Sequence, residues 1–183
     1  MKKILLLLIT SLYLYANECH YEVKKLDIEW EAYKTPLKIG VKGTFDNLTV
    51  NANDKSSQKS FLQTATIKIN TSDINSKNSI RDAKLVKFFF DVQNVKNITI
   101  KSVSLQHNIL MLDITMNKMT KQIPMKVEFD DEIEAKGHID LADFKMLPAL
   151  QSINQACFDL HKGKTWQDVE IEFEMELQKV CSH

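Results

Sequence analysis

The chain has 183 residues, with 24 basic and 24 acidic side chains and a formal net charge of zero. This length suits one domain, and the 44% share of hydrophobic residues excludes disorder of the whole chain. The absence of a basic excess argues against nucleic-acid binding, and only four glycines and three prolines argue against Gly-rich phosphate loops and Pro-rich linkers.

The first 16 residues have the pattern of a secretory signal peptide. Two lysines precede an apolar run that continues to Ala16, a small residue suited to the cleavage position. The run is shorter than the roughly 20 residues that a membrane-spanning helix needs. An uncleaved anchor is the alternative, and lipoprotein processing is disfavoured because Glu18 precedes Cys19. We therefore expect residues 17–183 to form a soluble periplasmic domain without a membrane span.

Alternation of apolar and polar residues predicts that most of the remaining chain forms β-strands. The clearest case is the segment 166–180, where apolar residues alternate with four glutamates. We interpret these glutamates as one solvated strand face at steps of about 7 Å, and not as a catalytic or metal cluster. The expected strands cover residues 26–33, 37–45, 64–70, 98–105, 109–116, 123–129, 133–141 and 166–180.

Two segments have helical spacing instead. Residues 79–90 and 148–161 place apolar side chains three and four apart, and the second segment has a proline at its start and Gly163 just past its end. Residues 47–59 are polar without periodicity and are expected to form a loop. About eight strands joined mostly by short turns, with two short helices, predict an all-β fold: an antiparallel sandwich or barrel.

Antiparallel pairing of the first and last long strands would close such a barrel and remove its free edges. This pairing would bring Cys19 beside Cys181, and we expect a disulfide between them in an oxidising compartment. Cys157 lies on the apolar stripe of its helix and is expected to be a buried thiol. The alternative is a metal site made by the two reduced cysteines with His20 and His183.

The same pairing predicts a β-bulge. In ideal register Trp30 would face a glutamate, although residues that face each other must lie on the same side of the sheet. A slip of one residue pairs Trp30 with Val169 or Ile171. We therefore expect a bulge between Cys19 and Trp30, near Lys24 and Lys25, where two like residues break the alternation.

Four stretches carry a family pattern: IEWEAYKTPLKIGVKGTFDNL (28–48), TSDINSKNSIRDAKLVKFFF (71–90), MTKQIPMKVEF (119–129) and HIDLADFKMLPALQSINQACFDLHKGKTWQDVEIEF (138–173). In this order they resemble the YceI-like family, which comprises exported, lipocalin-like, polyisoprenoid-binding proteins. The resemblance covers nearly the whole of residues 17–183. It implies an eight-stranded barrel with an elongated apolar tunnel, and favours a homodimer.

The resemblance further implies a protein that holds an isoprenoid or other long lipid chain, as a carrier or store, without catalysis. The ligand classes are an isoprenoid quinone, a polyprenyl phosphate or a fatty amide, and no other cofactor is expected. Inward strand parity and the aromatic turn elements predict that the tunnel is lined by Trp30, Phe45, Phe89, Leu112, Ile114, Met116, Phe129, Phe144 and Phe173.

Polar groups that orient a head group are expected at the tunnel mouth. The candidates are Lys34, Thr35, Arg81 and Asp82, from the Lys-Thr corner and the start of the first helix. Arg81 is the only arginine in the chain, and its bidentate geometry suits a phosphate or carboxylate. A structural role, in an Arg81–Asp82 pair or as a helix cap, is the alternative.

Two other function classes stay open. The barrel could be filled by its own side chains, in which case the protein would be a structural or stress-response protein that binds a partner through its outer face. An enzyme acting on a bound lipid would need a buried acid or base at the tunnel end, and the sequence places none. It has no GxSxG, HExxH, P-loop or dinucleotide motif, so we expect no enzyme.

Overall fold

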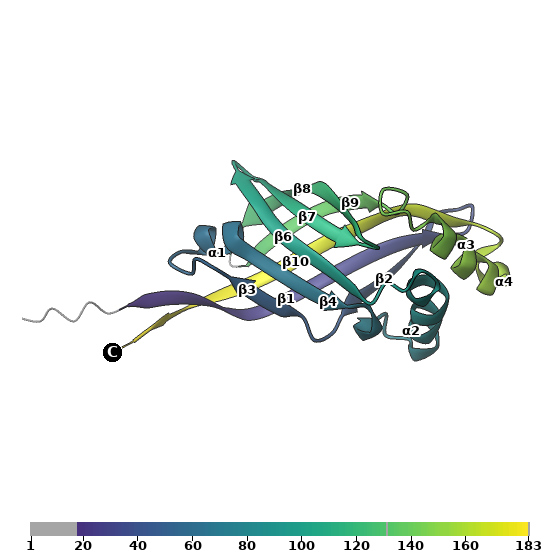
Figure 1. Ribbon diagram of the computed structural model, residues 1–183, viewed down its shortest axis with the longest axis horizontal. Helices are drawn as coiled ribbons and strands as arrows, with labels where there is room; N and C mark the ends of the chain where they lie inside the picture. Colours follow the sequence, from purple (N-terminus) through teal and green to yellow (C-terminus); the bar gives the residue numbers. More distant parts are fainter. Residues whose placement is uncertain (1–17, 131, 183) are drawn as a thin grey trace, which may run out of the picture.

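The structure is a computed structural model that describes residues 18–130 and 132–182, so the predicted signal peptide, residues 1–16, lies outside the described residues. Ten antiparallel strands form one strongly curled sheet, which confirms the all-β prediction with two more strands than expected (Figure 1). In chain order the strands are β1 (Cys19–Lys34), β2 (Ile39–Phe45), β3 (Thr49–Ala52), β4 (Ala65–Asn70), β5 (Ile74–Asn75), β6 (Asn97–Gln106), β7 (Ile109–Met116), β8 (Met119–Phe129), β9 (Ile133–Asp140) and β10 (Thr165–Cys181).

The long ribbon of β1 and β10 confirms the predicted pairing and its register. Trp30 faces Ile171, and the ladder shifts by one residue between Val23 and Lys25. Lys24 is therefore the extra residue of a β-bulge, at the predicted place. The bulge reconciles the two ends of β1, because it lets the cysteines pair while the apolar side chains of both strands share the inner face.

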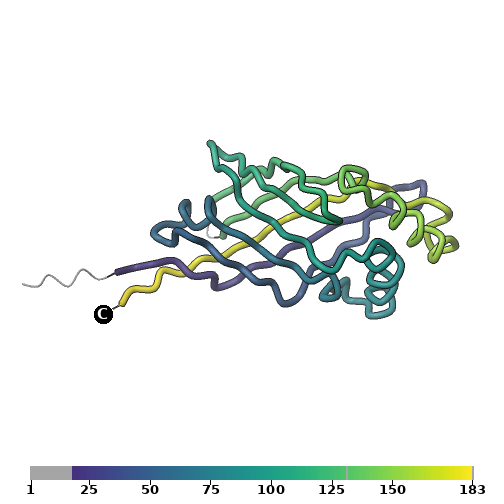
Figure 2. Tube along the Cα trace, viewed as in Figure 1, coloured from purple at the N-terminus to yellow at the C-terminus, as the bar shows by residue number. Residues whose placement is uncertain are grey.

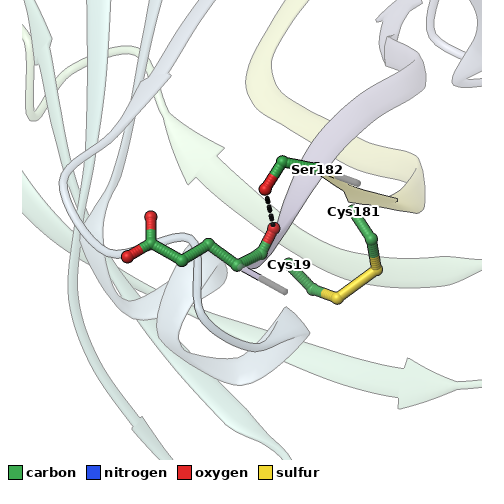
Figure 3. The surroundings of a disulfide bond; sticks show 4 residues. Cys19, Cys181 and Ser182 are labelled. Atoms are coloured by element: carbon green, nitrogen blue, oxygen red, sulfur yellow. Dashed lines mark hydrogen bonds between the residues drawn. A yellow bond between two sulfur atoms is a disulfide. The ribbon is translucent and has the colours of Figure 1, made fainter. Parts of the chain in front are cut away.

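The predicted disulfide joins Cys19 to Cys181 across 162 residues of sequence (Figure 3). Beside it, the backbone N–H of Ser182 donates a 3.1 Å hydrogen bond to the carbonyl oxygen of Glu18. Cys157 is buried and unbridged, as expected. Because both sulfur atoms are bonded to each other, neither is available as a thiolate ligand. The alternative metal site also needs His183, which lies outside the described residues.

Closure of the barrel differs from the expectation. The strand order is β3-β4-β6-β7-β8-β9-β10-β1-β2-β5, so the β1–β10 pair lies inside the sheet, which ends at β3 and β5. The wall is completed by the continuous segment 39–52, whose first part pairs with β1 and whose last part pairs with β4. The chain bends between the two parts, where Asn47 has a positive φ of 55°. The result is a half-barrel with two short edge strands.

The expected polar loop 47–59 contains a strand and leads into a helix. The four residues of β3 lie in it, and α1 (Gln58–Thr64) begins there with Ser57 as its N-cap, whose side chain accepts a 3.0 Å hydrogen bond from the N–H of Ser60. This helix buries Phe61 and Leu62 against the core. Both elements are too short to establish a period in the sequence, so their tertiary contacts define them.

Each predicted helix is present but divided in two. The first is α2 (Ser79–Leu85), which continues into a π-helical turn, η2 (Val86–Phe90). The second comprises α3 (Leu147–Ala156) and α4 (Phe158–His161). Two 3-10 turns, η1 (Thr71–Asp73) and η3 (Asp91–Gln93), complete the structure. None of the helices in the described part of the chain is long and apolar enough to cross a membrane.

The four glutamates of β10 lie on the outer face, as predicted. Glu172 accepts from Lys136 at 2.8 Å, and Glu174 from Lys25 at 3.3 Å, so the face is a ladder of surface ion pairs. Figure 2 shows that α2, α3 and α4 gather at one end of the sheet, opposite the end that carries the disulfide. This helix end holds the candidate site.

Candidate ligand-binding cavity

An apolar cavity of about 390 Å³ lies between the inner face of the sheet and the helix end. Its walls come from β1, β2, β4, β5, β6, β7, β9 and β10 on one side and from α2, η2, α3 and α4 on the other. Aliphatic and aromatic side chains form most of this surface. An empty apolar space of this size is rare in a close-packed interior, and it lies in the range of small-molecule sites.

Six of the nine residues predicted to line the tunnel surround this cavity. They come from four strands and from the π-helical turn after α2, and they are Trp30, Phe45, Phe89, Ile114, Met116 and Phe173. The strand alternation that placed them on the inner face also applies to the neighbouring aliphatic residues. Sequence reasoning missed much of the aliphatic wall, for example Ile28, Val169 and Ile171, although the same parity indicates them.

Three predicted lining residues lie elsewhere. Leu112 and Phe144 are buried but pack away from the cavity, whereas Phe129 is 46% exposed at the last position of β8. Phe129 has inward parity, but it lies beyond the part of the sheet that other elements cover. Parity gives the face of a strand and not the depth along it. The half-barrel is thus hollow toward the helices and filled beside β8, where Met125 and Val127 are fully buried.

The aromatic wall of the cavity depends on a glycine. Gly43 of β2 faces Trp30 of β1, and a Cβ atom at Gly43 would lie 2.4 Å from the indole Cζ2 and 2.9 Å from the carbonyl oxygen of Asn75. The indole therefore lies across the bare backbone of β2. Its Nε1–H donates a 3.4 Å hydrogen bond to the carbonyl oxygen of Thr44, which fixes the ring as one side of the cavity.

The mouth of the cavity is basic. Of the predicted mouth residues, Lys34 and Arg81 line it, and the structure adds Lys84 and His161, which sequence reasoning missed. No aspartate or glutamate occurs among the described lining residues. The i, i+3 spacing of Arg81 and Lys84 on one helix was a usable signal. His161 had none, because only the tertiary fold brings α4 beside α2.

The imidazole of His161 is held in one orientation. Its Nδ1 lies 2.8 Å from the hydroxyl oxygen of Thr165, which itself donates a 3.0 Å hydrogen bond to Asn154. Since that hydroxyl donates its proton to Asn154, Nδ1–H of His161 is the donor, and in the neutral imidazole Nε2 carries no proton. Burial, and then the charges of Lys34 and Lys84, lower the pKa of His161 below its usual value. The lysine charges thus add to the effect of burial, which is the larger cause.

Arg81 and Asp82 are joined through Ser76. The guanidinium donates from Nε to the Ser76 hydroxyl and from Nη2 to the Ser76 carbonyl oxygen, both at 2.7 Å. Asp82 accepts from the backbone N–H of Ser76 at 2.9 Å and from its hydroxyl. Asp82 thus ties β5 to α2 and does not line the cavity, which corrects the prediction. Arg81 thus has the structural role that the sequence left open, and it also lines the cavity, with further N–H donors beyond those bonded to Ser76.

Thr35 is also not a mouth residue. It is buried, with a positive φ of 66°, and its hydroxyl has no hydrogen-bond partner among the described residues. Its backbone N–H donates to the carbonyl oxygen of Lys164 at 2.9 Å, and its carbonyl oxygen accepts from Trp166 Nε1 at 2.8 Å. Thr35 therefore anchors the turn between β1 and β2 to the start of β10, which holds Lys34 in place.

A second, more polar hollow of about 630 Å³ separates the first half of β1 from β3. The hydrogen bond from the N–H of Tyr21 to the carbonyl oxygen of Lys55, at 2.8 Å, crosses this gap. Phe45 borders both hollows. The ring of Phe45 therefore stands between the apolar cavity and the gap in the wall.

The family follows from a comparison with known domains. Residues 22–177 match the model of the YceI-like domain, which is most of the chain. The protein belongs to the YceI-like family. No curated protein sequence matches this chain.

Solved structures place this YceI-like chain in the same fold. A polyisoprenoid-binding domain from Saccharophagus degradans has a TM-score of 0.61 at 12% identity, over 88% of this chain and 98% of that one. BcnA of Burkholderia cenocepacia has a TM-score of 0.58 at 12% identity, over 86% and 99%. The YceI protein of Campylobacter jejuni has a TM-score of 0.53 at 14% identity, over 78% and 85%.

These YceI-like structures agree with the curled antiparallel sheet described above and thereby confirm the predicted family and fold class. Because their sequence identity to this chain is low, they show the fold alone, and the ligand must be inferred from the cavity residues of this chain. The apolar wall and the cationic mouth are the features on which a function can be argued.

Proposed function

We propose that this YceI-like protein binds an isoprenoid or other long apolar chain in its cavity and serves as a carrier or store, without chemistry on the chain. The cavity of about 390 Å³ carries the proposal, because unfilled apolar space surrounded by buried aliphatic and aromatic side chains is suited to a lipid tail. The similar domain from Saccharophagus degradans, described as polyisoprenoid-binding, supports it. A wholly filled barrel, the alternative, would leave the helix half of this interior unexplained.

We further propose that the head group is anionic. Lys34, Arg81 and Lys84 converge at the mouth, and no carboxylate among the described lining residues balances them. Among the three ligand classes, this favours a polyprenyl phosphate over a quinone or a fatty amide, which are uncharged. The lowered pKa of His161 has the same cause in part, since nearby lysine charges disfavour its protonation. An anion bound at the mouth would relieve this repulsion.

Export and a homodimer also belong to the proposal. The Cys19–Cys181 disulfide is the kind of bond that persists in an oxidising compartment such as the periplasm. Analysis of the periplasmic fraction by non-reducing peptide mapping tests both the location and the bridge. Light scattering of the purified protein tests the homodimer, for which a mass of one chain would be the contrary result.

The central experiment combines extraction with fluorescence. Native mass spectrometry before and after organic extraction should reveal a co-purifying apolar molecule. Met116→Trp places a fluorophore in the cavity wall, and Phe129→Trp, at an exposed site outside the cavity, is the matched control. Trp30 and Trp166 also line the cavity, so the parent protein gives the reference response. Geranylgeranyl phosphate should change the emission of the first variant more than that of the parent, and the second variant should respond no more than the parent does. No response of Met116→Trp to any long-chain lipid would contradict the proposed function.

A further inference from the structure

Large apolar side chains protrude from the mouth end of the molecule. Leu37 in the turn between β1 and β2 is 80% exposed, Ile80 on α2 is 72% exposed, and Leu160 on α4 is 62% exposed. Phe158, also on α4, is 60% exposed. Three separate elements thus present apolar tips around one opening, and Ile80 and Leu160 also line the cavity. Single exposed apolar residues are ordinary, but a cluster of them around a site is not.

The same end carries a strong positive charge. The segments 34–39, 77–87 and 145–164, each of which contributes to the cavity lining, contain nine basic and two acidic residues, a net charge of +7. Since the whole chain is neutral, all its other residues together carry −7. The mouth end is therefore positive and the rest of the molecule negative. Near a negatively charged surface, the protein should turn its mouth end toward that surface.

Eight of these nine cations also have no ion pair among the described residues, in contrast to the cations on the strands. Among residues 18–130 and 132–182, Lys38 is the only one of the nine with an ion pair, to Asp168. On the outer strand faces, by comparison, Lys25, Lys42 and Lys136 each contact two or more carboxylates. Apart from Lys38, the cations at the mouth end thus have no carboxylate partner among the described residues and are available to external anions.

We propose that the mouth end docks on a membrane surface that contains anionic lipids. The surface of such a membrane has a layer of lipid head groups above the acyl chains. The exposed apolar side chains can enter the boundary of the acyl chains, and the ammonium groups of the flanking lysines can contact the lipid phosphates. A protein partner fits less well, because lysine is depleted in the cores of protein interfaces. Docking places the cavity mouth against the bilayer, so a lipid tail reaches it without crossing water. This last consequence rests on the proposed function, whereas docking itself does not.

Vesicle flotation of the mature protein tests the proposal. Vesicles of phosphatidylcholine with about 30% phosphatidylglycerol should bind the protein, pure phosphatidylcholine vesicles should bind it much more weakly, and about 0.5 M NaCl should release it. Lys87→Glu and Lys162→Glu should each weaken binding by about fivefold or more. Leu37→Asp, outside the cavity lining, should weaken it by about tenfold or more.

The matched controls lie away from the mouth. Lys59→Glu on α1 and Phe129→Asp at the end of β8 change the same kinds of side chain and should leave vesicle binding unchanged. The proposal would be overturned if the protein bound both vesicle types equally, or if the control variants lost as much binding as the mouth variants. It would also be overturned if Leu37 lay in a dimer interface and the protein did not bind vesicles. The Met116→Trp titration in solution separates the two claims. Adding Leu37→Asp to Met116→Trp should leave its response to geranylgeranyl phosphate unchanged, and the absence of a response in Met116→Trp itself would count against the proposed function and not against docking.

Discussion

Removal of the disulfide should destabilise the protein by up to about 5 kcal/mol. The bridge joins residues 162 apart in sequence, and the chain-entropy model gives about this value for a closed loop of that length. The value is an upper bound. Without the bridge, the ends of β1 and β10 beyond the bulge gain freedom in the folded state, which offsets part of the loss. We expect a net decrease of about 3–5 kcal/mol in the free energy of unfolding.

The measurement is guanidinium chloride unfolding of the parent protein and of the double variant Cys19→Ser/Cys181→Ser. With a slope of about 4 kcal/mol per M, the midpoint should fall by about 1 M. Dithiothreitol should lower the parent midpoint to that of the double variant and leave the double variant unchanged, so an effect on Cys157 is controlled. A decrease below about 0.5 kcal/mol would refute the reasoning, because a long loop closed in the unfolded chain must reduce its entropy.

Three further predictions concern the cavity. Gly43→Ala forces a Cβ into the ring of Trp30, so it should cost about 1–3 kcal/mol in urea unfolding and weaken lipid binding, whereas Gly40→Ala, which meets only the flexible end of a glutamate, should do neither. Arg81→Lys should weaken the binding of geranylgeranyl phosphate about fivefold or more and leave a fatty amide unaffected; equal affinity for the phosphate would disprove its role. The lowered pKa of His161 stabilises the fold above its ordinary pKa of 6.5, and this contribution declines as the pH falls through the lowered folded value. Urea unfolding between about pH 7.5 and pH 5.5 should show a decline that His161→Asn reduces, and an identical decline in the variant would contradict the assignment.

The β1–β10 ribbon was predictable residue by residue because two independent constraints act on it. The alternation of β10 fixes which side chains face inward, and the cysteine pair fixes the ends of the ladder. Together they required the bulge that the structure has between Val23 and Lys25. By contrast, closure of the wall was not predictable, because it depends on the bend at Asn47 and on a strand of four residues.

The candidate site was predictable where it depends on strand parity and not where it depends on tertiary approach. Trp30 and Phe173 lie on long alternating strands, and both line the cavity. Phe129 shares their parity, but it lies where the sheet is uncovered. His161 belongs to a four-residue helix, and no local pattern could place it beside the lysines of other elements.

The β1–β10 ribbon has a practical consequence for experiments on this protein. Its two strands run the length of the molecule, from the disulfide to the helix end (Figure 1). The C-terminal residues and the cavity mouth therefore lie at opposite poles. A tether attached after the last residue would hold every molecule on a sensor surface with its mouth toward the solution, which lets ligands and vesicles reach the mouth from the solution side.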